Sequence, residues 1–249
     1  MPVSKHNTQF FAAYNDIKQK ILSGFFSHDD RLREIEVANL LGMGRTPVRE
    51  ALKRLEDERL LTHEPRRGLV VTRIDQQGVT ELYAMREILE AAAAEFAARH
   101  ATDAEIDNME SILAEESRCG DDLVALNLAF HDAIYGAAHN QHLIRSLKAV
   151  TETTYLLGRS TLQNPQRSDV ALGEHLAIVA AIRARDPRAA AEAARHHIRQ
   201  AFLERLKILR ERVSAPDPHP SPKTGAARRV RTVRGLDAAH VRAARRADH

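Results

Sequence analysis

The chain has 249 residues, of which 43% are hydrophobic and 4% aromatic, and it contains no tryptophan. This length can hold two domains with buried cores, and alanine runs such as 91–94 and 189–191 favour close-packed helices over sheets. A single cysteine, Cys119, excludes an internal disulfide, and no long apolar stretch or leader is present, so we expect a soluble cytoplasmic protein that does not interact with membranes.

Charge is unevenly distributed along the sequence. The net charge is +3 over residues 1–74, −5 over residues 75–213 and +5 over residues 214–249. A basic front and an acidic middle suit a nucleic-acid-binding head joined to a body that does not touch the polyanion. We therefore expect a DNA-binding domain over 1–74, an all-helical ligand-binding domain over 75–213 and a disordered Pro/Arg-rich tail over 214–249. The tail fits either non-specific DNA attraction or an inert extension.

Three helices are predicted in the head. Apolar residues recur at helical spacing in three places, and a glycine at position 24 or 42 ends each of the first two. The expected buried positions are Phe10, Tyr14, Ile17 and Ile21 in the first helix; Ile35, Ala38 and Leu41 in the second; Val48, Ala51, Leu52 and Leu55 in the third. The third helix begins near Arg45, with Pro47 in its first turn, where a missing N–H is harmless.

The polar face of the third helix has the chemistry of a major-groove reader. Arg45, Thr46, Arg49 and Lys53 lie away from the apolar stripe and place cations and a hydroxyl near the helix N-terminus. Residues 60–72 then read as a strand, a basic turn and a second strand, a wing whose tip carries Arg66, Arg67 and Gly68. Any one of these arginines fits an ordinary solvated surface equally well, but their ordered combination favours DNA contact.

The stretch from Leu40 to Glu56, with Arg45-Thr46-Pro47-Val48-Arg49-Glu50 at its centre, and the later Pro65-Arg66-Arg67-Gly68 resemble the winged helix-turn-helix of the GntR family. The resemblance covers residues 9–74. It implies that Arg45, Thr46 and Arg49 contact an operator and that Gly68 lets the backbone approach DNA. The chain departs from the family pattern twice, with Gly44 where Ser or Thr is usual and Arg59 where Gly is usual.

The body reads as six helices between Asp75 and Arg212, and polar residues interrupt their apolar stripes. Arg86 lies inside the apolar row of the helix over 76–100, so it needs a partner, either Glu90 one turn on or an anionic ligand in a cavity.

Three further stripes contain histidines. Asn127 and His131 lie one turn apart, His175 lies in the stripe of a later helix, and His197 is in line with apolar positions of the last helix. Buried imidazoles without partners are costly, and one shared divalent metal satisfies all three.

The segments 127–131, 174–175 and 196–198 resemble the metal-ligand segments of the FCD domain, the ligand-sensing domain of the FadR subfamily, over residues 76–210. The resemblance implies that Asn127, His131, His175 and His197, rather than His196, hold zinc, nickel or manganese. It also implies that a carboxylate effector completes the site beside Arg86. Asn127 stands where Asp is common, and a neutral amide is the weaker ligand.

We therefore expect a mainly helical homodimeric repressor that binds double-stranded operator DNA and is switched by a small organic acid. The alternatives are a constitutive DNA-binding protein with a structural metal, and a metalloenzyme. The enzyme is disfavoured because neither a general base beside the histidines nor an HExxH signature occurs in the sequence.

Overall fold

The structure is a computed structural model that describes residues 5–117, 123–158 and 160–214. These residues are mainly helical, with one two-stranded antiparallel sheet, as predicted. In chain order the elements are α1 (Lys5–Leu22), α2 (Glu34–Leu41), α3 (Arg45–Asp57), β1 (Leu61–Glu64), β2 (Gly68–Val71), α4 (Gln76–His100), α5 (Asp103–Glu116), α6 (Leu123–Ala137), α7 (Gln141–Tyr155), a 3-10 turn (Thr161–Gln163), α8 (Pro165–Arg183) and α9 (Pro187–Ser214). Cys119 and the tail from 215 onward lie outside the described residues. No helix within these ranges is long and apolar enough to cross a membrane.

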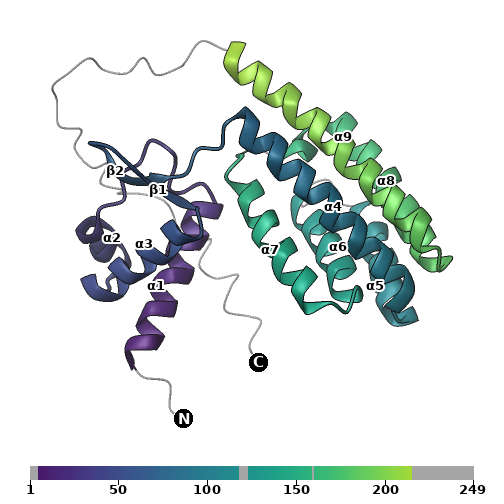
Figure 1. The fold of residues 1–249 in the computed structure, drawn as a ribbon, viewed down its shortest axis with the longest axis horizontal. Coiled ribbons are helices and arrows are strands. Elements are labelled where there is room, and N and C mark those ends of the chain that lie inside the picture. Colours follow the sequence, from purple (N-terminus) through teal and green to yellow (C-terminus); the bar gives the residue numbers. More distant parts are fainter. Residues whose placement is uncertain (1–4, 118–122, 159, 215–249) are drawn as a thin grey trace. The chain divides into compact units, whose positions relative to one another are not determined.

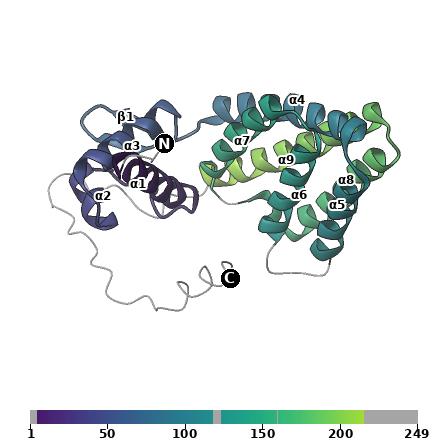
Figure 2. The same cartoon turned by 90° about the horizontal axis from the view of Figure 1, so that it is seen from below.

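The head is a three-helix unit with a hairpin wing (Figure 2). Helix α1 packs on α3, and all four residues of the predicted α3 stripe are buried. The prediction for α2 was partly wrong, because Ile35 is 54% exposed while Val37 and Ala38 fill the core. An eight-residue helix offers two turns to the core, and here they turn Val37 inward instead of Ile35.

The wing is a hairpin in which Leu61 pairs with Val71 and Glu64 with Gly68. Its three-residue turn, residues 65–67, has left-handed backbone at Arg66, with φ of +68°, and Gly68 at the start of β2 has φ of +84°. Leu32 adds to the hairpin by donating its N–H to the carbonyl of Leu69. This main-chain bond fixes the wing to the segment that precedes α2.

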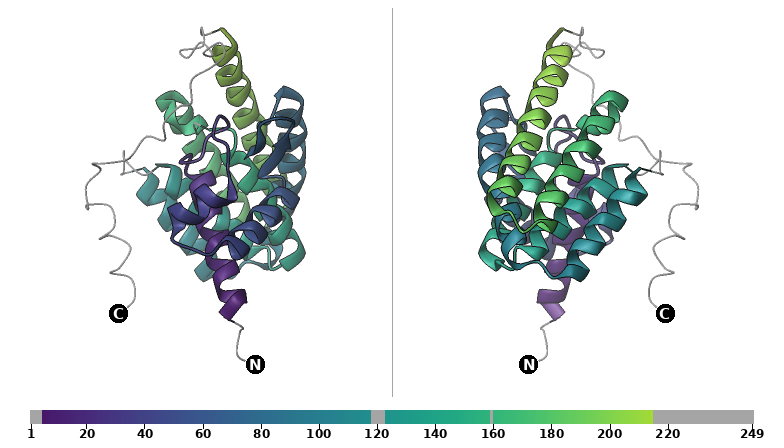
Figure 3. Two further views of the ribbon diagram at one scale, coloured as in Figure 1. Left: turned by 90° about the vertical axis from the view of Figure 1, so that its left-hand side faces the viewer. Right: turned by 90° about the vertical axis from the view of Figure 1, so that its right-hand side faces the viewer.

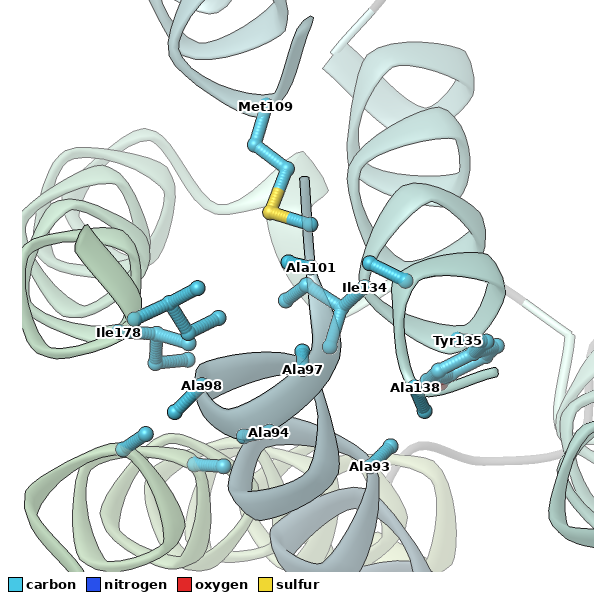
Figure 4. Close-up of a cluster of buried hydrophobic side chains, with 14 of the residues drawn as sticks. Ala93, Ala94, Ala97, Ala98, Ala101, Met109, Ile134, Tyr135, Ala138 and Ile178 are labelled. Atoms are coloured by element: carbon cyan, nitrogen blue, oxygen red, sulfur yellow. The ribbon is translucent and has the colours of Figure 1, made fainter. Parts of the chain in front are cut away.

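The body is a six-helix bundle with an alanine-rich centre. Helix α4 packs against α6, α7 and α8, and it contributes Ala93, Ala94, Ala97 and Ala98, which Figure 4 shows beside larger residues of neighbouring helices such as Ile134 and Ile178. Small side chains let helix backbones approach closely, which explains why alanine runs predicted this core. Helices α8 and α9, green and yellow-green, run side by side in the right-hand view of Figure 3.

Side-chain caps fix where the body helices begin. Asp75 caps α4, Thr102 and Glu105 form the predicted capping box of α5, and Asn164 caps α8 ahead of Pro165. Asp186 accepts from the N–H groups of Arg188 and Ala189 at the start of α9, again as the sequence indicated. These caps fix the residue at which each of these helices begins.

Candidate metal centre, effector cavity and nucleic-acid interface

Three histidines from three helices meet inside the body. His131 of α6, His175 of α8 and His197 of α9 are 6%, 0% and 4% exposed, and their possible ligand atoms all lie within 4.8 Å of one another. The ring centroids of His175 and His197 are 4.6 Å apart, and those of His131 and His197 are 5.3 Å apart. His196, the neighbouring alternative, is exposed and lies outside the cluster.

Each imidazole is held from behind by a glutamate. The Nδ1 of His131 lies 2.9 Å from Glu90, and the Nδ1 of His197 lies 2.7 Å from Glu174. The third pair, His175 Nδ1 and Glu116, is longer at 3.4 Å. A carboxylate on Nδ1 fixes the tautomer that leaves the lone pair on Nε2, the arrangement that orients metal-ligating histidines in proteins.

The histidine cluster fits a divalent ion. Nε2 of His175 is fully buried and has no hydrogen-bond partner in the described residues, a costly state that a metal bond would relieve. Tetrahedral zinc needs ligand nitrogens roughly 3.3 Å apart, given Zn–N bonds of about 2.0–2.1 Å, so small side-chain rotations from the present spacing suffice. Among the described His, Cys, Asp and Glu side chains, this is the cluster whose geometry could hold an ion.

Burial tunes the histidines towards the neutral form that binds metals. Burial lowers the pKa of His175, and the hydrogen bond to Glu116 opposes the shift. Burial, followed by repulsion from His175 and His131, holds the pKa of His197 well below its usual range. Both imidazoles are therefore uncharged at neutral pH and need lose no proton before they ligate a metal.

Arg86 has the partner that the sequence left open as one of two choices. Its Nη2 lies 2.7 Å from Glu90, whose other oxygen accepts from His131, so the three side chains form a buried chain. Burial acts to raise the pKa of Glu90, but Arg86 and then His131 outweigh it and hold that pKa at about 2. The pairing with Glu90 does not exclude the other predicted partner, an anionic ligand, because Arg86 also lines a cavity.

That cavity has a volume of about 430 Å³ and opens beside the histidine cluster. Asn127, His131 and His197 line it together with Arg86, whereas His175 does not. Asn127 thus lies one helical turn before His131 on the same side of α6, and both residues line the same cavity. A cavity of this size suits a small organic molecule.

The predicted DNA-contacting residues lie on the surface of the head. Arg45, Thr46, Arg49 and Lys53 are exposed on α3, and the side chain of Arg45 approaches Glu34 at 3.7 Å while staying 67% exposed. A groove in the head is lined by Arg45, Arg49, Lys53 and Gly68. Cations from the helix and the wing backbone therefore line one concave surface, as a duplex-binding face requires.

The two arginines of the wing differ. Arg66 is exposed at the turn, whereas Arg67 pairs with Glu64 at 2.9 Å and donates to the carbonyls of His28 and Asp29. Arg67 therefore braces the hairpin in this state, and contact with DNA would require it to exchange those bonds for phosphate. This bracing role could not be predicted from the sequence, because the contacting carbonyls lie 38 and 39 residues away.

Both departures from the family pattern have structural consequences. Gly44 is the N-cap residue of α3 and offers no side-chain cap, so the donors at this helix end lack a hydroxyl partner. Arg59 has φ of +63°, the left-handed conformation that glycine adopts most easily. The usual glycine at position 59 thus has a conformational reason, and Arg59 carries strain there.

Several site residues were missed by sequence reasoning. These are the clamps Glu116 and Glu174, the cavity arginines Arg167 and Arg205, and Arg31, which lines the head groove beside Gly68. Glu174 had a signal, because it adjoins His175 in the motif already singled out. Arg167 and Arg205 also had a signal, because each lies two helical turns from a histidine of its own helix, Arg167 before His175 and Arg205 after His197. Glu116 belongs to a different helix, so no local spacing relates it to His175.

Comparison with known proteins defines the class. The profile described as "Bacterial regulatory proteins, gntR family" matches residues 12–71, and the FCD domain profile matches residues 81–200. With the winged head and the helical bundle, these matches define a DNA-binding transcriptional regulator with an effector-sensing domain, and not an enzyme. The chain belongs to the GntR family, in the FadR-like subfamily that carries an FCD domain.

Relatives support this membership over most of their length. The probable D-xylose utilization operon transcriptional repressor of Paenarthrobacter nicotinovorans is 32% identical over 172 residues, covering 67% of this chain and 75% of the relative. YdhC, an HTH-type transcriptional regulator of Bacillus subtilis, is 28% identical over 218 residues, covering 84% and 96%. The solved structure of Escherichia coli McbR/YncC matches with a TM-score of 0.67 and 23% identity, covering 86% of this chain and all of that one, and shows the fold alone.

Proposed function

We propose that the protein is a homodimeric repressor that releases or rearranges on operator DNA when a small carboxylate binds a metal-containing cavity. The single observation that carries the proposal is the cluster of three buried imidazoles, each with Nδ1 held by a glutamate. These glutamates orient the imidazoles as ligands for an ion, and at His175 the Nε2 on the opposite side of the ring has no partner among the described residues. The named repressor among the relatives supports the sign of regulation.

In this proposal His131, His175 and His197 supply the metal ligands, and Asn127 supplies a fourth through its amide oxygen. The bound ion, which we take to be zinc, nickel or manganese, would supply positive charge and open coordination for an anion. Arg86 orients the effector from the cavity wall. Because the protein ligands are all neutral, the charge of the ion is left for the effector to offset, and a carboxylate does so.

We assign operator contact to α3 and the wing. Arg45, Thr46, Arg49 and Lys53 reach base edges and phosphates from the helix, and the wing contributes Arg66, Arg67 and the backbone at Gly68. Two heads in a dimer would read two half-sites of a pseudo-palindrome. We place the division between the DNA-binding and sensing domains at residues 74 and 75, and that between the sensing domain and the tail at 213 and 214.

The test begins with genomic fragments selected by the purified protein, which supply an operator duplex. Metal-loaded and chelated protein are then titrated onto that duplex by fluorescence anisotropy, with and without a panel of carboxylates, and mass is measured by light scattering. We expect a dimer and a change in operator affinity of about 5–150-fold with at least one acid, the usual range of allosteric coupling.

A structural metal is the second candidate, favoured by the lack of solvent exposure at His175. It predicts that metal stabilises the protein while no carboxylate changes either the melting temperature or operator affinity. That outcome would refute the sensing proposal and leave DNA binding intact. A monomer on a single half-site would refute the dimer.

A further inference from the structure

The cavity beside the histidine cluster is unusually positive. Three arginines line it, Arg86, Arg167 and Arg205, and no Asp or Glu of the described residues is among its lining side chains. Carboxylates do lie behind two of these arginines, since Glu90 pairs with Arg86 and Glu174 with Arg167. Arg205 instead donates to the carbonyl of Leu157. The wall of the cavity therefore presents cationic groups whose counter-charges are on the far side.

Arg167 is the residue that this arrangement leaves incomplete. It is 6% exposed, and its Nη2 donates to Glu174 at 2.7 Å. Its Nε and Nη1 are buried and have no hydrogen-bond partner in the described part of the chain. Guanidinium donors seldom stay unsatisfied in a protein interior, because each loses its bond to water and gains nothing. Arg205 repeats the pattern, with a buried and unpartnered Nε.

The position of Arg167 differs from that of Arg86. One oxygen of Glu174 accepts from both Arg167 and His197, so a single carboxylate connects Arg167 to the histidine that α9 contributes to the cluster. The carboxylate of Glu90 connects Arg86 in the same way to His131, the histidine that α6 contributes. The cavity thus has basic groups on two different flanks of the histidine cluster, and a single carboxylate held at the cluster does not need both.

We propose that Arg167, supported by Arg205, forms a second anion subsite and that the effector is a diacid. One anionic group meets the metal cluster, and the other accepts a charge-assisted hydrogen bond from one of the unpaired N–H donors of Arg167, at Nε or Nη1. This inference rests on the proposed carboxylate-sensing function and narrows it. The ion and Arg167 are two separate cationic groups on one cavity wall, and a diacid can meet both whereas a monoacid meets only one.

The test measures binding to zinc-loaded full-length protein by calorimetry. The probes are acids matched in carbon chain and hydroxylation, succinate against butyrate and glucarate against gluconate. We expect at least one diacid to bind ten times more tightly than its matched monoacid. In Arg167→Lys this preference should fall to less than threefold, while zinc content and monoacid affinity stay at the wild-type level. Arg183→Lys, the same change at an exposed residue of α8, is the control and should keep the preference.

Equal binding of diacid and monoacid by the wild type in both pairs would overturn the diacid assignment. An unchanged preference in Arg167→Lys would overturn the role of Arg167. If that variant loses zinc because Glu174 is disturbed, the wild-type ratio together with Arg205→Lys decides, and a preference unaltered in Arg205→Lys counts against the subsite. Failure of all four acids to bind would refute carboxylate sensing itself, a result distinct from binding without preference.

Discussion

Glu116 offers the cleanest test of the metal centre, because its described contact is the bond to His175. Glu116→Gln keeps the size of the side chain and removes the charge that holds Nδ1. Losing a carboxylate that holds a metal-binding histidine weakens metal binding by about 10–100-fold, and the long 3.4 Å separation places the expected loss near tenfold. Tenfold corresponds to about 1.4 kcal/mol of binding free energy.

The assay is a zinc competition titration combined with the melting temperature at saturating zinc. Metal bound to the folded state stabilises it in proportion to the logarithm of its affinity, so the variant should lose about 1.4 kcal/mol of zinc-dependent stability. For a chain of this size that is a melting temperature roughly 3–6 °C lower with zinc. Glu115→Gln, the same change at the exposed neighbouring residue, is the matched control. Equal zinc affinity in the two variants would refute the clamp reasoning.

Further predictions concern the head and the pH response. Arg49→Ala should weaken operator binding by about 1–3 kcal/mol in anisotropy titrations, whereas Arg188→Ala, the same change at an exposed arginine of the body, should leave it unchanged; equal losses in both would contradict the assigned face. Arg59→Gly should raise the free energy of unfolding by about 0.5–1 kcal/mol, since relief of left-handed strain exceeds the entropy that glycine adds to the unfolded chain, and calorimetry showing a lower stability would argue against that strain. Because the pKa values of His175 and His197 are lowered from 6.5, the unfolded state binds more protons just below pH 6.5, so stability of the chelated protein should fall from pH 7.5 to 5.5; a flat profile in thermal melts would contradict their burial as neutral groups.

Periodicity was sufficient to predict most of the fold. The α3 stripe, the wing and the caps at Thr102 and Asp186 depend on local spacing and on short-range hydrogen bonds, which the sequence states directly. The prediction that Ile35 is buried was wrong, because a short helix can turn a different apolar residue towards the core and bury a similar amount of apolar surface.

The candidate site was predictable only in part. A histidine in an apolar stripe is visible as an anomaly, and His131, His175 and His197 are each such an anomaly in their helices. Their glutamate clamps depend on which helices become neighbours: Glu116 lies 59 residues from His175. Charged residues such as Arg167 look like ordinary surface until tertiary packing encloses them. For Arg86 the sequence left two partners open, Glu90 or an anionic ligand. The structure pairs Arg86 with Glu90 and also places it in the lining of the cavity.

The histidines and their clamps come from α4, α5, α6, α8 and α9, five of the six helices described in the body. An ion at their centre would act as a cross-link among helices that otherwise pack mainly through apolar side chains. A shift of the ion on ligand binding would act directly on all five helices, with no need for a chain of intermediate contacts. The same connectivity means that substitutions far apart along the chain converge on one coordination sphere, so the sensor has many places at which evolution can retune it.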